Sequence, residues 1–393
     1  MKKGSITAML RIPRILRSLD PFLILLIATV GAASLLPAQG VTAIWTDRLA
    51  DLAIALLFFL HGAKLSRQAI LQSVGHWRLH GLVFASTYIW FPIAGLVVVY
   101  LARGWVDPLL LSGLLFLTLL PSTVQSSIAF TAMAGGNVAA AVTSASLSNL
   151  FGIVLTPLLV SIFMRAGAVG PSGWGSVESI VLKLLVPFIG GHLLRPVIGG
   201  FVERNKKILQ PVDRGSILLV VYSAFSAAVV NGIWSRVDAA DLLELLALSA
   251  VILAFIMGIN ALAGHILGLR REDNIVLLFC GSKKSLVSGV PMAGALFAPA
   301  QVGLVVLPLM IFHQLQLFVC ATLAGRFRRE GEALAEAVSP SVTVPRTETE
   351  IAAAAQGVGM SVPEACMPGV ATNMALLDRH AKTLLGPDGA RKP

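Results

Sequence analysis

The sequence predicts an all-α, polytopic membrane protein with about ten transmembrane helices arranged as two inverted five-helix repeats. Three observations predict this class. Hydrophobic residues make up 56% of the 393 residues, and charged residues only 13%. Apolar stretches long enough to cross a bilayer recur between Pro21 and Gly325, separated by short polar breaks. The basic residues are concentrated in alternate connections between these stretches, as the positive-inside rule describes.

The apolar stretches define the predicted spans in chain order. They cover residues 21–38, 49–63, 80–102, 108–134, 138–164, 176–195, 214–234, 242–268, 273–297 and 300–324. The second span is short for a hydrocarbon core about 30 Å thick. The fourth and ninth spans are interrupted by proline or polar residues, and such discontinuous helices are typical of secondary transporters.

The loop charges predict the orientation of the chain. Basic residues precede the first span and follow the second, sixth, eighth and tenth spans, whereas the odd-numbered connections carry far fewer. Cytoplasmic loops hold an excess of Lys and Arg. We therefore expect a multi-pass protein of the cell inner membrane with both termini in the cytoplasm.

Composition also predicts four segments along the chain. Residues 1–20 form a basic cytoplasmic N-terminus, residues 21–164 the first five-helix repeat, and residues 165–327 the second, inverted repeat. Residues 328–393 are rich in Ala, Pro, Ser, Thr and Glu, which favours a mobile cytoplasmic tail with a short helix around Ala371 to Leu385.

Other classes of protein lack support in the sequence. The net charge of +10 comes from basic residues scattered among short loops, which indicates topology rather than nucleic-acid binding. The three cysteines form no CxxC pair. No HExxH, GxSxG or P-loop motif occurs, so we predict no enzyme activity. The expected partners are the lipid bilayer and a small transported solute.

The two interrupted spans predict the position of a site. Five spans are an odd number, so a second five-span unit must enter the membrane inverted, and inverted repeats place substrate sites near the midplane. At about 1.5 Å per residue, Pro121 lies roughly 20 Å and Lys283 roughly 18 Å into a core about 30 Å thick. Unwound backbone at that depth must line a polar cavity.

Oxygen-bearing side chains next to the first break are candidate ligands for a cation or a substrate. A hard cation binds hydroxyl, amide and backbone oxygens, although Ser and Thr in membrane helices also permit close packing or bond to their own backbone. The candidates are Gln125, Ser126, Ser127, Ser148 and Asn149, with Thr143 and Ser144 one turn earlier. A possible Na⁺ site consists of Ser126, Ser127, Ser148 and Asn149.

The second break contains Ser282, Lys283, Lys284 and Ser285. An ammonium group near the bilayer centre costs at least about 2.5–3.5 kcal/mol, so it needs compensation. A snorkelling lysine is one reading. Alternatively, a lysine lines the cavity and replaces a sodium ion, carries a proton, or faces an anionic substrate. His313 in the tenth span is a further candidate, although an interhelical hydrogen bond is the more common role of such a residue.

These residues resemble a known family. The Pro121 to Ser127 break, the Gly135-Gly136-Asn137 turn, the hydroxyl-rich stretch from Thr143 to Asn149, and the Gly281 to Ser285 break are together similar to the bile acid:sodium symporter superfamily. The similarity extends over roughly residues 15 to 327 and points to a bacterial branch of sodium-dependent transporters, which also contains the seventh member of vertebrate solute carrier family 10.

The resemblance implies a core domain, in which the broken fourth and ninth helices cross, and a panel domain of four helices. It also implies sodium binding by an acidic residue and a Gln on the ninth helix, where this chain has Lys283 and Lys284. We therefore expect a secondary active transporter of a small organic anion that works by alternating access at the crossover, with sodium coupling implied by the resemblance. The alternatives are a sodium-independent carrier, either proton-coupled or a uniporter, with lysine in place of the cation, and a non-transporting regulatory protein that affects ion homeostasis.

Overall fold

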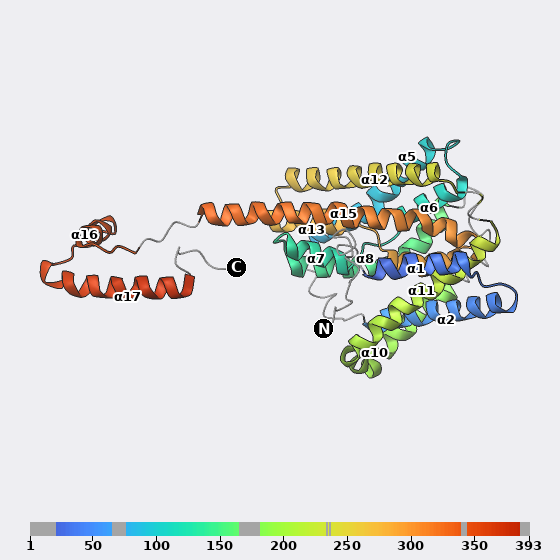
Figure 1. Ribbon diagram of the computed structural model, residues 1–393, viewed down its shortest axis with the longest axis horizontal. Coiled ribbons are helices and arrows are strands. Elements are labelled where there is room, and N and C mark those ends of the chain that lie inside the picture. The colour runs from blue at the N-terminus through green and yellow to red at the C-terminus, as the bar shows by residue number, and fades with distance from the viewer. Residues whose placement is uncertain are drawn as a thin grey trace, which may run out of the picture. The chain divides into compact units, whose positions relative to one another are not determined.

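The computed structural model describes residues 21–64, 76–164, 181–232, 235, 237–338 and 344–385, and it contains no β-strand among them. The expected basic N-terminus, residues 1–20, lies outside the described residues. The chain divides into two compact units, Met1–Phe327 and Arg328–Pro393. The helices of the first unit are α1 (Pro21–Leu35), α2 (Val41–Lys64), α4 (Trp77–Ala85), α5 (Phe91–Leu101), α6 (Pro108–Thr118), α7 (Gln125–Met133), α8 (Val138–Phe163), α10 (Val186–Arg204), α11 (Lys206–Val230), α12 (Ala239–Ile266), α13 (Arg271–Gly281), α14 (Leu286–Leu296) and α15 (Pro299–Val338), which continues into the second unit (Figure 1).

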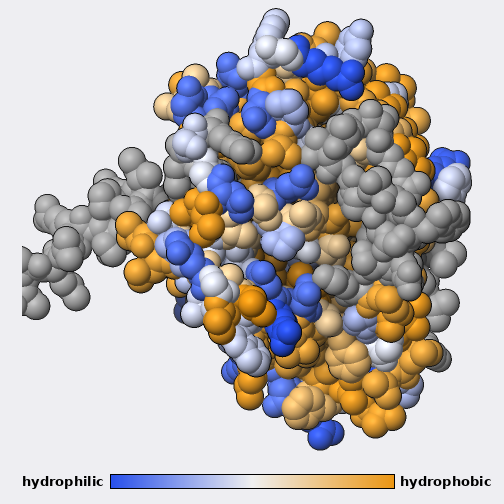
Figure 2. Space-filling view, turned by 90° about the vertical axis from the view of Figure 1, so that its right-hand side faces the viewer, coloured by the Kyte–Doolittle hydropathy of each residue, from blue (hydrophilic) through white to orange (hydrophobic). Residues whose placement is uncertain are grey.

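The outer surface of the first unit is suited to lipid. Six helical stretches among the described residues are long and apolar enough to cross a membrane, and shorter apolar helices lie beside them. Large apolar side chains point outward from several helices, including Leu52, Val97, Val154, Leu193 and Val251. In the face shown in Figure 2, hydrophilic residues are interspersed with hydrophobic ones. The chain is therefore a polytopic membrane protein, as the composition predicts.

The described helices coincide with the predicted apolar stretches, with differences at their ends. The second stretch, predicted to be short, forms the 24-residue helix α2 because residues 41–48 extend it toward the N-terminus. The tenth continues in α15 for 40 residues, well beyond residue 324, because Ala, Glu and Arg in residues 326–338 are good helix formers.

One group of helices consists of α1, α2, α10 and α11. Helix α2 packs along both α10 and α11, and α1 packs on α11, and all four lie on the same side of the unit in Figure 1. The contact between α2 and α10 depends on two glycines. A Cβ on Gly62 would lie 2.0 Å from the Phe188 carbonyl oxygen, and one on Gly191 would lie 2.0 Å from the Phe59 carbonyl oxygen. The backbones therefore approach more closely than alanine permits.

Four of the predicted spans are irregular in the described part of the chain. In the sixth, a π-helical turn, η5 (Val181–Leu185), precedes α10. The fourth forms α6 and α7 with unwound residues between them, and the ninth forms α13 and α14 in the same way, which confirms both predicted breaks. The third span has an irregularity that the sequence analysis missed. A π-helical turn, η3 (Ser86–Trp90), separates α4 from α5, and Pro92 follows it in the first turn of α5.

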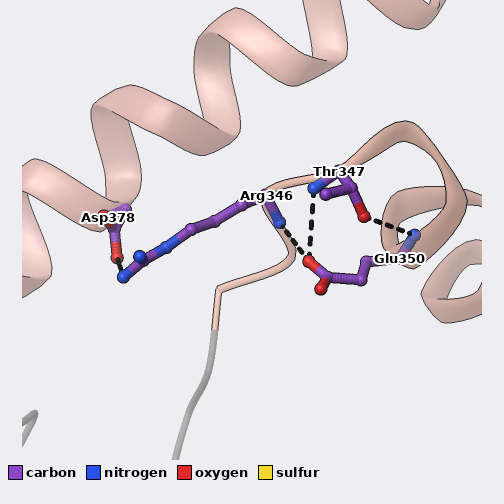
Figure 3. A network of polar contacts seen from close by, with 4 residues as sticks. All are labelled: Arg346, Thr347, Glu350 and Asp378. Atoms are coloured by element: carbon purple, nitrogen blue, oxygen red, sulfur yellow. Dashed lines mark hydrogen bonds and ion pairs between the residues drawn. The ribbon is translucent and has the colours of Figure 1, made fainter.

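The second unit contains the end of α15 and the helices α16 (Glu348–Gly357) and α17 (Met367–Leu385). Thr347 and Glu350 form a capping box at the start of α16, and Arg346 pairs with Asp378 of α17 at 3.0 Å (Figure 3). The helix expected around residues 371–385 lies inside α17. Helix α16 was not expected, because its alanine-rich sequence has no sustained apolar stripe.

Candidate functional site

The two broken helix pairs contact each other at their unwound residues. The Ser285 backbone N–H donates to the Pro121 carbonyl oxygen at 2.9 Å, and the Ser122 hydroxyl donates to the Cys280 carbonyl oxygen at 2.6 Å. The Ser127 hydroxyl donates to the Phe279 carbonyl oxygen at 3.2 Å. We call residues 119–124 and 282–285 the crossover. Its unpaired backbone groups are satisfied across the contact, as an apolar environment demands.

Side chains from three other helices hold the second half of the crossover. The Ser86 hydroxyl donates to the Gly281 carbonyl oxygen at 2.8 Å, and the Asn260 amide donates to the Ser282 hydroxyl at 2.9 Å. Gln316 of α15 bonds both backbone groups of Lys284. Its Oε1 accepts from the Lys284 N–H at 2.8 Å and its Nε2 donates to the Lys284 carbonyl oxygen at 2.9 Å. The unwound chain is therefore fixed in one conformation.

The first half of the crossover is held by α8. The Ser148 hydroxyl accepts from the Ser122 N–H at 3.0 Å, and the Asn149 amide donates to the Ser122 carbonyl oxygen at 2.6 Å. The Asn149 Oδ1 also accepts from the Ser288 hydroxyl of α14 at 2.9 Å, which ties both halves to α8. Two residues of the predicted set lie elsewhere. The Ser144 hydroxyl contacts His80 Nδ1 at 2.8 Å, and Thr143 does not line the cavity described below.

Both predicted lysines are fully buried, and neither forms an ion pair with a carboxylate in the described part of the chain. The Lys284 Nζ donates to three backbone carbonyl oxygens. The Lys283 Nζ lies 3.5 Å from the Ser126 hydroxyl and 4.1 Å from the centre of the Phe130 ring. Snorkelling to the interface, one of the readings of the sequence, is therefore wrong for both.

A cavity of about 1470 Å³ lies next to the crossover. Five predicted site residues line it, namely Gln125, Ser126, Asn149, Ser285 and His313. The opposite wall comes from α2, α10 and α11 and contributes Leu57, Phe58, His61, Lys64, Phe188, Gln210, Asp213, Arg214 and Ile217. Most of this lining is apolar. Polar residues lie at the crossover, and the charged residues Lys64, Asp213 and Arg214 lie on the opposite wall.

Three charged residues of this cavity were missed as site residues by the sequence analysis. Lys64 and Arg214 were read only as loop charges that set the orientation, and Asp213 was not considered. In the structure Lys64 pairs with Asp213, and the Arg214 guanidinium lies 5.6 Å from the centre of the Phe22 ring. All three residues lie on helices rather than in loops, because α2 extends to Lys64 and α11 begins at Lys206, before Asp213 and Arg214.

The possible sodium ligands are already engaged within the protein. Ser127 donates to the Phe279 carbonyl oxygen of α13, and Ser148 accepts from the crossover N–H of Ser122. Asn149 uses both amide atoms, and Ser126 accepts from Lys283. A sodium ion at these four residues would compete with those hydrogen bonds. It would also lie close to the Lys283 ammonium, and two unit charges 4 Å apart repel by about 4 kcal/mol at an effective dielectric of 20.

Comparisons with known proteins agree with one another. The model of the SBF-like CPA transporter family (DUF4137) matches residues 20–329. The Escherichia coli (strain K12) protein YfeH is 53% identical over 321 residues, which cover 82% of this chain and 96% of that protein. The uncharacterized protein PA2026 of Pseudomonas aeruginosa is 53% identical over 324 residues, 82% of this chain and 97% of that protein. Mouse sodium/bile acid cotransporter 7 is 28% identical over 313 residues, 77% of this chain and 90% of that protein.

Proposed function

Because the chain belongs to the SBF-like CPA transporter family, we propose that it is a secondary active transporter that carries a small organic anion by alternating access. The observation that carries this proposal is the cavity of about 1470 Å³ beside the crossover. It is larger than the 300–1,000 Å³ of ordinary ligand pockets. It lies between the crossover and the group of α1, α2, α10 and α11. If this group rocked against the helices that form the crossover, the cavity would be exposed in turn to each side of the membrane.

Charge at the cavity supports an anionic solute. Lys64 and Asp213 pair with each other and so offset each other's charge, which leaves the Arg214 guanidinium as an additional positive charge in the wall. A second positive charge, on Lys283, lies behind Ser126 and Phe130, both of which line the cavity. With an otherwise mostly apolar lining, the site favours an organic anion that has a substantial apolar body.

The position of the charged residues leads us to propose that the structure corresponds to an inward-facing state of the transporter. The loop charges place Lys64 and Arg214 on the same side as the N-terminus, and we propose that this side is the cytoplasm and that both termini lie there. The cavity lined by these residues would then face the cytoplasm, in the inner membrane.

Binding and transport test this proposal in two steps. Thermal stabilisation of the purified protein by a library of organic anions identifies a ligand, and uptake of that ligand into proteoliposomes tests transport. Loss of a charged hydrogen bond costs about 1.5–3 kcal/mol, so Arg214→Gln should weaken binding about ten- to hundredfold. Arg204→Gln, at an exposed position outside the cavity, serves as the control. If no anion binds and no solute moves, the non-transporting alternative replaces the proposal.

The same assay addresses the coupling ion. We propose that sodium contributes less than in the bile acid carriers of the family, because the Lys283 ammonium lies next to Ser126 of the possible sodium site. Anion-dependent stabilisation should then be similar in NaCl and KCl for the wild type, and sodium should gain an effect in Lys283→Gln. Strong sodium dependence of the wild type, unchanged in Lys283→Gln, would instead support sodium at Ser126, Ser127, Ser148 and Asn149.

A further inference from the structure

Three backbone carbonyl groups converge on the ammonium group of Lys284. The Nζ lies 2.8 Å from the Thr87 oxygen, 2.8 Å from the Thr118 oxygen and 2.7 Å from the Leu120 oxygen. These oxygens come from the π-helical turn η3, the end of α6 and the first half of the crossover. We call the three carbonyl groups the carbonyl cage.

Two of these carbonyls are free because local structure removes their helical donors. In η3 the Phe91 N–H donates to the Ser86 oxygen, and the next N–H along the chain that could reach the Thr87 oxygen would belong to residue 92, a proline without an N–H. Likewise, Pro121 offers the Thr118 oxygen no donor, and the Ser122 N–H bonds the Ser148 hydroxyl. The oxygens therefore require a donor from elsewhere.

The number of contacts matches the charged form of lysine. An ammonium group has three N–H donors, and the cage supplies three acceptors at the 2.7–2.9 Å typical of charge-assisted bonds. The Phe91 ring centre lies 4.1 Å from Nζ, so an aromatic face adds to the negative surroundings. The C-terminal end of α6 contributes its helix dipole with the same sign. The cage thus has the chemistry of a binding site for a monovalent cation.

We propose that the carbonyl cage is a monovalent-cation site and that Lys284 is its permanently attached cation. The ammonium joins η3, α6 and the crossover through one charge, so free ions cannot exchange there in the wild-type protein. Removing the side chain should empty the cage and allow it to bind a free cation of ammonium type. This inference concerns ion binding by the folded protein and does not depend on which solute is transported.

Chemical rescue tests the proposal. In Lys284→Ala, three buried carbonyls lose their donor, so the melting temperature of the purified protein should fall. Ammonium, methylammonium or propylammonium chloride should raise it again in a saturable manner, whereas choline chloride at the same ionic strength should not. Propylammonium, which has the three carbons and the nitrogen that the substitution removes, should be effective at the lowest concentration.

Lys283→Ala is the matched control. Its neighbour keeps the cage occupied, so alkylammonium salts should act on Lys283→Ala and on the wild type no more than choline does. Equal responses of Lys284→Ala to all these salts would overturn the proposal. A response of Lys283→Ala as large as that of Lys284→Ala would overturn it too, because the effect would then not come from the cage.

A second variant covers the case in which Lys284→Ala yields no folded protein. The amide of Lys284→Gln has two N–H donors and should leave an obtainable protein with intermediate stability. Cells expressing Lys284→Ala are then grown with and without methylammonium chloride, and the monodisperse fraction is measured by size exclusion. Recovery of folded Lys284→Ala only with methylammonium supports the cage. Failure to recover it, with a normal yield and wild-type stability of Lys284→Gln, refutes the proposal.

Discussion

Lys283 and Lys284 are neighbours in the chain with different surroundings. All three N–H donors of the Lys284 ammonium are used by backbone carbonyls, and Gln316 fixes its backbone. Within the described residues, the Lys283 ammonium has one long hydrogen-bond contact, 3.5 Å, with the Ser126 hydroxyl, and it faces the Phe130 and Phe279 rings. Lys284 is therefore suited to a structural role, whereas the charge of Lys283 lies behind two residues of the cavity wall, Ser126 and Phe130.

A single carboxylate outside the membrane should make helix α16 sensitive to pH. The backbone N–H groups of Arg346 and Thr347 donate to Glu350 and lower its pKa below the ordinary value, with the Arg346 bond as the larger cause (Figure 3). A depressed pKa means that the carboxylate stabilises the helix above the ordinary glutamate pKa of about 4.3. This contribution is lost as the pH falls through the lower value in the folded state.

Hydrogen exchange of the full-length protein can measure this effect. The measured rates are first corrected for the intrinsic pH dependence of exchange. Amides at the start of α16 should then exchange faster as the pH falls through the lowered pKa of Glu350 and its carboxylate becomes protonated. Glu350→Gln cannot titrate and should show a smaller dependence on pH. The same dependence in both proteins would mean that another group controls the helix start.

At the scale of single residues, sequence reasoning identified the lysines but not their partners. The charge of Lys284 in an apolar span was sufficient to predict that something compensates it. The partner at Thr87 is 197 positions away in the chain, and it is a backbone atom whose availability depends on a π-helical turn. No side-chain pattern near Lys284 carries that information.

At the scale of the helix, the pair of α2 and α10 depends on the absence of side chains. Gly191→Ala would place a Cβ 2.0 Å from the Phe59 carbonyl oxygen, so the helices must separate. Overpacking of this kind costs roughly 1–3 kcal/mol. We expect a clearly lower melting temperature for Gly191→Ala. The matched control is Gly190→Ala, where a Cβ meets no atom within 4 Å, and this variant should be at least as stable as the wild type. A larger loss in Gly190→Ala would show that helix packing here does not follow the close contact.

The breaks in the helices were predictable to different degrees. Pro121 and the run from Gly281 to Ser285 stand out as polar or proline-containing interruptions of apolar spans, and both breaks are present. The π-helical turn η3 was not predicted, because the apolar residues on both sides of Pro92 continue the pattern of an unbroken span. One extra residue in a helical turn changes the hydrogen bonding without changing composition.

At the scale of the whole molecule, the predicted orientation can be tested through the cavity. Ser146 lines it, whereas Trp105, in the connection after the third span, is 81% exposed. In a background of Cys366→Ser, which removes the exposed native thiol, we place a cysteine at either position. A membrane-impermeant maleimide should label Ser146→Cys in inside-out vesicles and Trp105→Cys in right-side-out vesicles. The reverse pattern would invert the topology, and an unlabelled Ser146→Cys on both sides would contradict an open cavity.

The cavity as a whole could not be derived from the sequence. Composition and loop charge predicted the spans, and the interrupted spans predicted where the site lies in depth. The wall formed by Leu57, Phe188 and Arg214 depends instead on how α2, α10 and α11 pack against the crossover. Only the folded arrangement brings these distant residues to the same place.

The amide of Gln316 has a consequence for the biosynthesis of this protein. It bonds both backbone groups of Lys284 from α15, and Lys284 in turn bonds carbonyls that are synthesised about 160 to 200 residues earlier. The earlier spans therefore leave the ribosome with acceptors that no emerged residue can yet satisfy. The site closes only when the last span of the first unit has entered the bilayer, so its assembly is a late event that follows insertion rather than accompanying it.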